Sequence, residues 1–291
     1  MVNSVAVIGV GAMGGPIARR LLDSGYNVVV CDARPEAVEP FEGTDAHITR
    51  HPRGCRDADL ALCLVASADQ VRDVVVGEGG LAHPGSAGTS PTIAVMSTVG
   101  HDFLRRLQDE LSSKSAARLL DAPISGGPAR AEQGRLSVIL GGADDDVEAC
   151  RSVFSCLGHD VFHCGPVGAA QVIKVANNVI GSVNTLISGE VYRLLQDLGV
   201  SLPAAIDIFE ASSGRNWLSA DPTAPSEVFS AYAPTKEAFE AMTRVMQKDS
   251  ALGMQLAAES GASFPTMEAV AQVIGVLGSE TFENWRLAGG L

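Results

Sequence analysis

Short apolar runs and helical patterns alternate along the first half of the chain. The apolar runs are rich in Val, Ile and Leu and cover residues 5–8, 28–31, 60–65, 93–96, 119–121 and 137–140. Runs of strand length that alternate with helical segments are typical of βαβ units, whose strands form one mostly parallel sheet. The pattern therefore predicts a doubly wound α/β domain over residues 1–164.

A different pattern begins after residue 164, where the β-branched runs stop. Helical periodicity covers residues 168–199, 203–212, 235–260 and 265–277. Segments of this length with a period of 3.6 residues indicate amphipathic helices. We therefore expect an all-α domain over residues 165–291. The turn-rich stretch 212–234 is expected to wrap the site or a partner subunit.

Composition and charge exclude several classes of partner. The chain has 291 residues, 46% of them hydrophobic and 19% charged, which suits a globular protein with a large core. The formal net charge of -13 repels phosphate backbones and acidic membrane surfaces, so neither nucleic acid nor membrane is an expected partner. The N-terminal apolar run has no positively charged flank and ends in glycines, which predicts a strand rather than a signal peptide.

Cysteine and histidine spacing give no sign of disulfides or metal ligands. The six cysteines are scattered without a CxxC pair, which favours a reducing, cytoplasmic location. The six histidines lack the paired spacing of metal-binding motifs, and the three aspartates at 144–146 suit a helix start. No metal site is predicted.

A glycine-rich turn follows the first apolar run. It reads Gly9-Val-Gly11-Ala12-Met13-Gly14 and stands between the strand at 5–8 and a helix that runs to about Ser24. In this context the first glycine allows the tight turn, the second lets the backbone approach a pyrophosphate, and the third lets helix and strand pack closely. The arrangement predicts a dinucleotide-binding domain of the Rossmann type, with these residues at the cofactor.

The second predicted strand ends in an acidic residue that bears on the choice of dinucleotide. Asp32 lies eighteen residues after Gly14, where a carboxylate accepts the ribose hydroxyls of NAD and repels the 2′-phosphate of NADP. NAD is therefore favoured over NADP. Arg34, two residues further on, has two interpretations: a cation that softens this preference, or a solvated arginine at a helix start.

Four segments together resemble one family. They are the glycine turn, Asp121-Ala-Pro-Ile-Ser125-Gly126-Gly127, the stretch from Gly165 to Asn178, and Lys248-Asp249. In this order and spacing they are similar to the β-hydroxyacid dehydrogenases, the group that contains 3-hydroxyisobutyrate and tartronate semialdehyde dehydrogenases. The similarity covers essentially the whole chain and implies an NAD-binding domain followed by a helical domain, joined by a long helix.

Lys174 matches the catalytic lysine of that family, on the long interdomain helix. The resemblance implies that it exchanges the proton of the substrate hydroxyl. A lysine amine of ordinary pKa, about 10.4, is protonated at neutral pH, so the role requires burial and a neighbouring cation. Lys248 matches a family lysine near both nicotinamide and substrate and is the candidate neighbour, with a surface lysine as the alternative.

Further matches imply contacts with substrate. Asn178 lies four residues after Lys174 on the same helix face and matches a substrate-binding asparagine; without the resemblance, these residues would be interdomain polar contacts. Ser125, Gly126 and Gly127 are expected in a loop after a strand, where the family holds the substrate carboxylate; a simple β-turn is the alternative. Trp217 lies in a segment that lines the family's pocket, although it suits core or interface packing equally well.

Other matches imply contacts with the cofactor. Thr98 resembles a threonine that contacts the nicotinamide end, while an ordinary helix N-cap is its alternative. Val65 and Ala66 stand where relatives usually have Leu-Pro, so the chain departs from the family there but keeps the backbone carbonyls. Cofactor contacts through these main-chain atoms are expected to survive.

The resemblance thus implies reversible, NAD-dependent oxidation of a short 3-hydroxy acid, with Lys174 as the proton-transfer group. An imine reductase on the same scaffold is the first alternative, although such enzymes usually replace this lysine. A non-catalytic dinucleotide-binding scaffold is the second. A homodimer or homotetramer formed through residues after about Gly165 is expected.

Overall fold

The chain folds into two compact units in this computed structural model, Met1–Lys174 (the N-terminal unit) and Val175–Leu291 (the helical unit). The structure describes residues 2–83, 90–219 and 233–288. Residues 220–232, most of the stretch expected to wrap the site or a partner, lie outside the described residues. Among the described helices none combines the length and hydropathy needed to cross a membrane.

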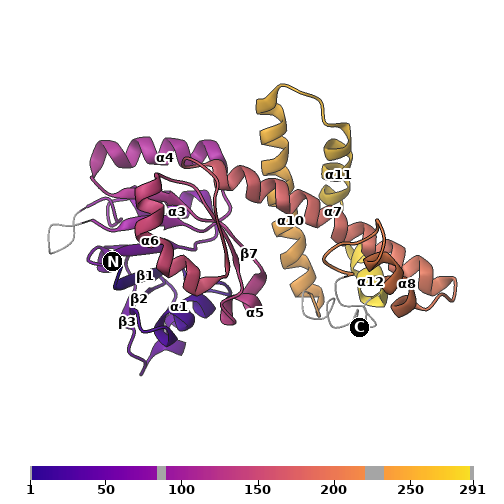
Figure 1. Ribbon diagram of the computed structural model, residues 1–291, viewed down its shortest axis with the longest axis horizontal. Helices are drawn as coiled ribbons and strands as arrows, with labels where there is room; N and C mark the ends of the chain where they lie inside the picture. Colours follow the sequence, from indigo (N-terminus) through magenta and orange to yellow (C-terminus); the bar gives the residue numbers. More distant parts are fainter. Residues whose placement is uncertain (1, 84–89, 220–232, 289–291) are drawn as a thin grey trace. The chain divides into compact units, whose positions relative to one another are not determined.

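Six parallel strands form the main sheet of the N-terminal unit, in the order β3-β2-β1-β4-β5-β6. The first three strands of the chain, β1, β2 and β3, are labelled in Figure 1. Their bounds are β1 Ser4–Ile8, β2 Asn27–Cys31, β3 His47–Thr49, β4 Leu60–Cys63, β5 Thr92–Val95 and β6 Arg118–Asp121. This is the strand order of the Rossmann fold, so the predicted doubly wound sheet is confirmed. The edge strand β3 was missed because its three residues carry no apolar run.

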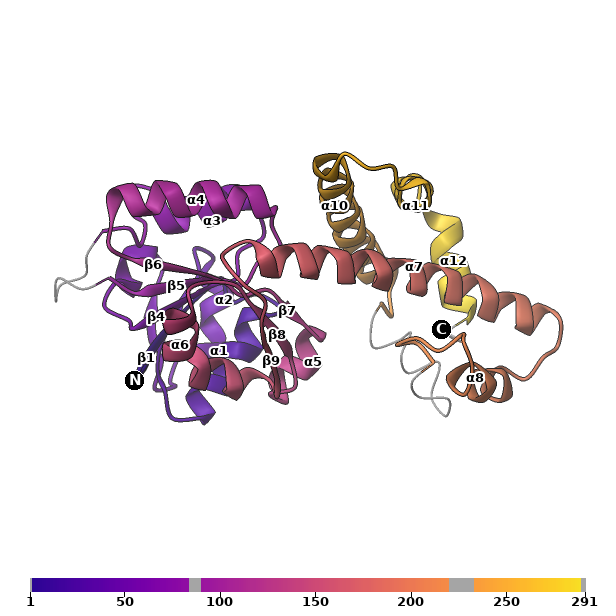
Figure 2. The ribbon, with the colours of Figure 1, turned by 45° about the horizontal axis from the view of Figure 1, so that its top comes forward.

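Helices cover both faces of this sheet. Figure 2 shows α3 (Ala68–Val76) and α4 (His101–Lys114) on one face, and α1 (Gly14–Asp23) and α6 (Asp144–Leu157) on the other. The shorter helical segments are α2 Pro35–Val38, α5 Gly127–Glu132, η1 Glu39–Phe41 and η2 Pro52–Cys55.

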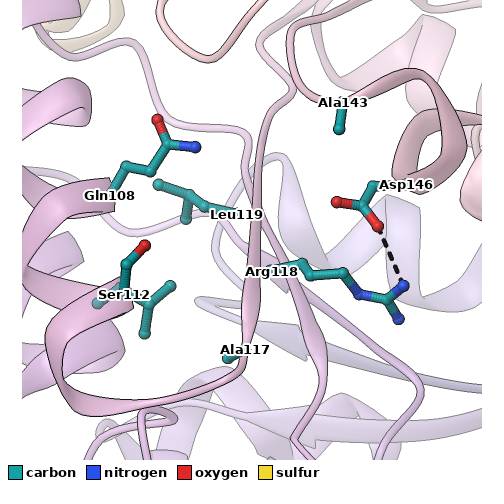
Figure 3. A pocket seen from close by; sticks show the side chains of 8 residues that line it. Gln108, Ser112, Ala117, Arg118, Leu119, Ala143 and Asp146 are labelled. Carbon is teal, nitrogen blue, oxygen red and sulfur yellow. Dashed lines mark hydrogen bonds and ion pairs between the residues drawn. The ribbon is translucent and has the colours of Figure 1, made fainter.

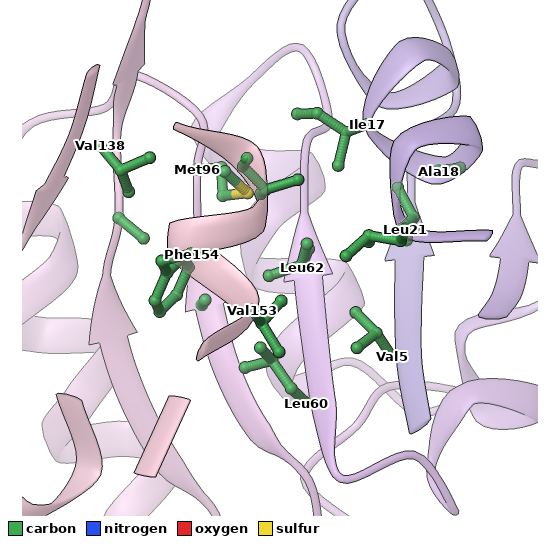
Figure 4. Packing of buried hydrophobic residues seen from close by; sticks show 14 of the residues in the cluster. Val5, Ile17, Ala18, Leu21, Leu60, Leu62, Met96, Val138, Val153 and Phe154 are labelled. Carbon is green, nitrogen blue, oxygen red and sulfur yellow. The ribbon is translucent and has the colours of Figure 1, made fainter. Parts of the chain in front are cut away.

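Side chains that alternate along each strand supply two separate cores. Val5 and Leu62 point to the α1 and α6 face, where they pack with Ile17 and Phe154 (Figure 4). Ala6, the neighbour of Val5, belongs to the opposite core under α3 and α4. Burial on both faces explains why these strands appear in the sequence as continuous apolar runs.

The apolar run at 137–140 belongs to a second, three-stranded sheet. This sheet has the order β7-β8-β9, with β7 Ile124–Ser125, β8 Ser137–Leu140 and β9 Asp160–His163. β7 runs antiparallel to β8, whereas β8 and β9 are parallel. Ser125 therefore lies in a short strand rather than in the predicted loop, because its backbone pairs with Ser137.

Five helices are described in the second half of the chain. They are α7 Ala169–Asp197, α8 Leu202–Glu210, α10 Lys236–Ser260, α11 Pro265–Gly275 and α12 Ser279–Ala288. The long helix α7 begins in the N-terminal unit and continues into the helical unit, as predicted. Tyr192, Phe239 and Trp285 form much of the core of the helical unit, and the Trp285 indole donates to the Ala233 carbonyl at 3.2 Å.

Candidate active site

The glycine turn joins β1 to α1 with very little space. Gly9 has φ of +91°, and a Cβ there would lie 2.6 Å from the Leu64 carbonyl oxygen. A Cβ on Gly14 would lie 1.9 Å from the Gly9 oxygen, so helix and strand pack closely only because position 14 is glycine. Gly11 and Ala12 are exposed, and Met13 is the N-cap of α1. An exposed backbone beside a helix N-terminus fits a pyrophosphate.

Asp32 follows β2, as predicted, and its carboxylate is 9% exposed. Oδ2 accepts the Val10 backbone N–H at 3.1 Å, which ties the carboxylate to the glycine turn. Burial alone would raise the pKa of Asp32, but hydrogen bonds from Arg34 and Val10 outweigh burial and lower that pKa. Asp32 is therefore ionised at neutral pH beside the turn, a position that fits the ribose of a dinucleotide.

Arg34 forms a two-pronged ion pair with Asp32. Its Nε lies 3.1 Å from Oδ1 and its Nη2 lies 3.1 Å from Oδ2. The guanidinium is 59% exposed and lies 3.5 Å from where a Cβ on Gly11 would stand. Arg50 donates to the Ala33 carbonyl at 2.8 Å, so a second guanidinium borders the same short segment. Arg34 is thus not a purely solvated side chain.

The loops after β4 and β5 are tied together. The Ser97 hydroxyl donates to the Val65 carbonyl at 2.6 Å. Ala66 is exposed, and its backbone N–H is bound by Gln70, which also forms a capping box with Ser67 at the start of α3. Helix α4 begins at His101 with Gly100 as its N-cap, so the half-buried Thr98 is not the cap that its alternative interpretation required.

A buried polar network connects the end of β6 to the first turn of α7. Asp121 and Gln171 have no exposed surface. Asp121 Oδ2 accepts the backbone N–H groups of Gly168 and Gln171 at 3.1 and 3.0 Å. Its Oδ1 accepts the Gln171 side-chain amide at 2.9 Å. Burial raises the pKa of Asp121 to about 6, although these hydrogen bonds act in the opposite direction.

Lys174 lies on α7 one helical turn after Gln171. Only 7% of its surface is exposed, and it is the last residue of the N-terminal unit. Lysines are seldom buried to this extent, because the ammonium group loses its hydration. The burial that the predicted role of Lys174 requires is present. Lys248, the predicted neighbouring cation, belongs to the helical unit.

Two glycines with positive φ follow β7. Gly126 has φ of +137° and Gly127 has φ of +75°, conformations that favour glycine. A Cβ on Gly126 would also lie 3.0 Å from the Arg130 side chain, whereas a Cβ on Gly127 would have no described atom within 4 Å. Ser125, Gly126 and Gly127 are half-buried. The predicted carboxylate contact at these residues stays a prediction.

Asn178, Lys248 and Asp249 come together in the helical unit. The Asn178 amide donates to Asp249 Oδ2 at 2.6 Å, and Lys248 Nζ lies 2.9 Å from Asp249 Oδ1. Asp249 is 2% exposed, while the Lys248 side chain is 42% exposed. The buried Asp249 carboxylate therefore orients Asn178 and Lys248, two of the residues predicted to contact the substrate.

Trp217 is half-buried and packs against the core of the helical unit with Tyr192 and Leu202. The neighbouring Asn216 is held by Ser188 on α7 and by Ser219. This arrangement supports the packing interpretation of Trp217. Its predicted role at the substrate stays a prediction.

A pocket at the amino end of β6 is separate from the predicted site residues. Arg118, the first residue of β6, and Asp146 on α6 form an ion pair at 3.0 Å on one side of it, opposite Gln108 and Ser112 (Figure 3). The predicted cofactor residues follow the carboxyl ends of the parallel strands, where α/β folds bind ligands, whereas Arg118 lies at the amino end of β6. This pocket has no part in the candidate site.

Sequence reasoning missed three residues that organise the site. Asp121, Gln171 and Asp249 all lie within the segments that carry the family resemblance, but the resemblance assigns no role to any of them. A charged residue that closes an apolar strand was the available signal for Asp121. Apart from Lys248, which adjoins Asp249, their side-chain hydrogen-bond partners lie 47 to 74 residues away along the chain, so spacing alone did not reveal the contacts.

Comparison with known families covers nearly the whole chain. Residues 4–165 match the family described as the NAD binding domain of 6-phosphogluconate dehydrogenase. Residues 168–284 match the family described as NAD-binding of NADP-dependent 3-hydroxyisobutyrate dehydrogenase.

Individual relatives agree with these matches. An NAD-dependent L-serine dehydrogenase of Pseudomonas aeruginosa is 31% identical over 265 residues, which cover 90% of this chain and 88% of the relative. A 3-hydroxyisobutyrate dehydrogenase of the same organism is 30% identical over 269 residues, with 90% and 88% covered. The solved structure of the Mycobacterium tuberculosis 3-hydroxyisobutyrate dehydrogenase with L-serine superposes with a TM-score of 0.78 at 25% identity, and 94% of this chain and 93% of that chain are covered.

Proposed function

Because the chain belongs to the hydroxyacid dehydrogenase family that contains the 3-hydroxyisobutyrate dehydrogenases, we propose that it oxidises a short 3-hydroxy acid reversibly to the corresponding semialdehyde or keto acid. The observation that carries this proposal is the burial of Lys174 on the first turns of α7. L-serine, named for two of the similar proteins, is itself a 3-hydroxy acid and falls within the proposed class.

In this proposal Lys174 moves the proton. Its Nζ takes the proton of the substrate hydroxyl during oxidation and returns it during reduction. The bound nicotinamide supplies the chemistry of hydride acceptance from the carbinol carbon. Asn178 hydrogen-bonds the substrate, held in orientation by Asp249, and Ser125, Gly126 and Gly127 bind its carboxylate. Lys248 and Trp217 complete the substrate contacts.

The proposed cofactor is NAD, with NADP disfavoured. Asp32 accepts the ribose hydroxyls through oxygens that are already fixed beside the glycine turn. Arg34 neutralises part of this charge and makes the discrimination weaker than a lone aspartate would. Gly9, Gly11, Ala12, Met13 and Gly14 bind the pyrophosphate, Val65 and Ala66 contribute backbone atoms, and Thr98 contacts the nicotinamide end.

A substrate panel tests the reaction. Pure protein is assayed for NAD and NADP reduction with 3-hydroxy acids, including 3-hydroxyisobutyrate and L-serine, and for NADPH and NADH oxidation with cyclic imines. We expect turnover of hydroxy acids and a loss of at least about 100-fold in Lys174→Ala. The matched control is Lys114→Ala, which removes an exposed lysine on α4.

The alternatives predict other outcomes. Imine turnover without hydroxy-acid turnover would identify an imine reductase, and cofactor binding without any turnover would favour a non-catalytic scaffold. Near-normal rates in Lys174→Ala would refute the proton-transfer role even with the proposed substrate class.

The proposed assembly is a homodimer or homotetramer formed through the helical unit. Ile180, Ile187 and Leu194 stand seven residues apart on α7 and are 63%, 51% and 56% exposed. Apolar side chains at this spacing share one helix face, which suits a second copy of the same chain. Sedimentation of the pure protein tests this assembly, and Ile187→Glu is expected to lower the measured mass. A monomeric wild type would refute it.

The proposed location is a reducing compartment such as the cytoplasm. All six cysteines are free thiols, and four of them are buried. Free thiols in this number favour a reducing environment. Retention of all six thiols in protein isolated under alkylating conditions is the expected result, and a native disulfide would contradict it.

A further inference from the structure

Gln171 connects three separate segments of the N-terminal unit. Its backbone N–H binds Asp121 at the end of β6, and its side chain reaches the loop between β5 and α4. Both Gln171 and Asp121 are fully buried. A buried polar network of this kind is rigid only when every member finds a partner.

Asp121 anchors the N-terminus of α7. The first N–H groups of a helix have no partner within the helix, and Asp121 Oδ2 accepts two of them, from Gly168 and Gln171. Asp121 is itself fixed, because its backbone exchanges hydrogen bonds with Gly141 at 2.8 and 2.7 Å. The start of α7 is therefore held against the end of β6.

The Gln171 side chain binds the backbone on both sides of Thr98. Its Oε1 accepts the Val99 N–H at 2.8 Å, and its Nε2 donates to the Ser97 carbonyl at 3.1 Å. Nε2 also donates to Asp121 Oδ1 at 2.9 Å. A flipped amide would face two acceptors with its oxygen and a donor with its nitrogen, so only this orientation satisfies all three contacts.

We propose that Gln171, together with Asp121, is a positioning residue that fixes the separation between Lys174 and Thr98. This inference rests on the proposed function, in which Lys174 transfers the proton and Thr98 contacts the nicotinamide end of the cofactor. Lys174 follows Gln171 by one helical turn. The side-chain amide that hydrogen-bonds the backbone on both sides of Thr98 therefore also fixes the position of the Lys174 backbone. Small displacements of reacting groups are costly, since a shift of about 1 Å can slow a reaction by about 100-fold.

The test replaces Gln171 by methionine, which keeps the length of the side chain and removes its hydrogen bonds. The control is Gln196→Met, an exposed position on the same helix. In Gln171→Met we expect kcat to fall by about 100-fold, while KM and the Kd for NAD change by less than about threefold. The isotope effect for substrate deuterated at the carbinol carbon is expected to rise. Hydrogen exchange of the Val99 amide is expected to accelerate, a readout that needs no turnover.

A double mutant separates positioning from general damage. Once Lys174→Ala has removed the amine, its separation from Thr98 no longer matters, so Gln171→Met should cost much less in that background. An equal loss in both backgrounds would overturn the proposal, as would normal kcat in Gln171→Met or a loss of NAD binding that accounts for the slow turnover.

Asp121→Asn tests the same network if Gln171→Met does not fold. The new amide cannot accept both from the helix N-terminus and from the Gln171 side chain. One hydrogen bond is lost if its NH2 group faces the Gln171 side chain, and two are lost if it faces the backbone N–H groups of Gly168 and Gln171. The expected result is again a lower kcat with KM unchanged, and normal kcat would count against the proposal. A fully active Lys174→Ala would refute the proton-transfer role of Lys174 and with it this role for Gln171, and the absence of any hydroxy-acid turnover would refute the proposed function itself. A fully active Gln171→Met refutes only the positioning role.

Discussion

Replacing Arg34 by alanine should sharpen the preference of the protein for NAD. In the native protein, two nitrogens of the guanidinium each lie 3.1 Å from an oxygen of Asp32 and partly neutralise it. The variant exposes the full negative charge of Asp32 and removes a cation that can turn toward a 2′-phosphate. The carboxylate keeps its hydrogen bond from the Val10 N–H, and the backbone N–H of residue 34 still donates to it.

The size of the effect follows from these contacts. One charge-assisted hydrogen bond to phosphate corresponds to about 10- to 100-fold in affinity, so NADP should bind more weakly by that factor. NAD binding should change by less than about threefold, because ribose hydroxyls need only the carboxylate. Since Arg34 is 59% exposed, solvent screens the ion pair and the melting temperature should change little.

The assay is calorimetric or fluorescence titration of both cofactors without substrate, at low and moderate salt. Arg72→Ala is the matched control: Arg72 is 53% exposed and also forms a two-pronged ion pair, with Glu110 on α4. The control should leave the ratio of the two dissociation constants unchanged. Equal weakening of NAD and NADP in Arg34→Ala, or no change in either, would refute the reasoning.

Three further variants probe other parts of the structure. Gly14→Ala should abolish cofactor binding and lower the melting temperature, because the new Cβ would lie 1.9 Å from the Gly9 carbonyl oxygen. The control Gly15→Ala should bind the cofactor normally, because its Cβ would lie 3.4 Å from the nearest atom, the Val10 carbonyl oxygen. The folded-state pKa of Asp121 is raised to about 6 from 3.8, so the folded protein holds this proton more tightly than the unfolded chain, and the stability this group contributes is lost as pH rises from about 4 to 6. The unfolding free energy of the wild type relative to Asp121→Asn should therefore fall by about 2 kcal/mol between pH 4 and pH 7 in urea titrations. A difference that does not change with pH would contradict the raised pKa of Asp121. Asp249→Ala should cost about 1–3 kcal/mol of stability, because the Asn178 amide loses its acceptor. It should also raise KM for the hydroxy acid more than it lowers kcat. An unchanged KM would contradict the proposed contact between Asn178 and the substrate.

Local patterns were sufficient where the structure depends on near neighbours. The strand at 5–8, the turn from Gly9 to Gly14 and the helix that follows form one βα unit whose residues are adjacent in the sequence. The long helix α7 was equally predictable, because its period is continuous over 29 residues. Asp32 was predictable because it stands eighteen residues after Gly14, directly after the second apolar run.

Local sequence patterns failed where the structure depends on contacts between residues far apart in the sequence. The apolar run at 137–140 predicts a strand but not its sheet, and the short β7 and β9, which carry no clear apolar run, place it in the second sheet. Arg34 had two interpretations in the sequence, and only the folded chain shows that its guanidinium forms two hydrogen bonds with Asp32. Its effect on the choice of dinucleotide stays a prediction.

The sequence by itself determined the type and order of most elements and the dinucleotide-binding turn. Periodicity and glycine placement encode these features, because they arise from sterics within a few residues. Lys174 became the candidate catalytic residue through the resemblance to the β-hydroxyacid dehydrogenases. The tertiary structure alone decided that Asp121, Gln171 and the loop at Ser97–Val99 form one network. The reason is physical: a buried carboxylate or amide must find partners, and only the folded chain brings residues 50 to 74 positions apart within hydrogen-bonding distance.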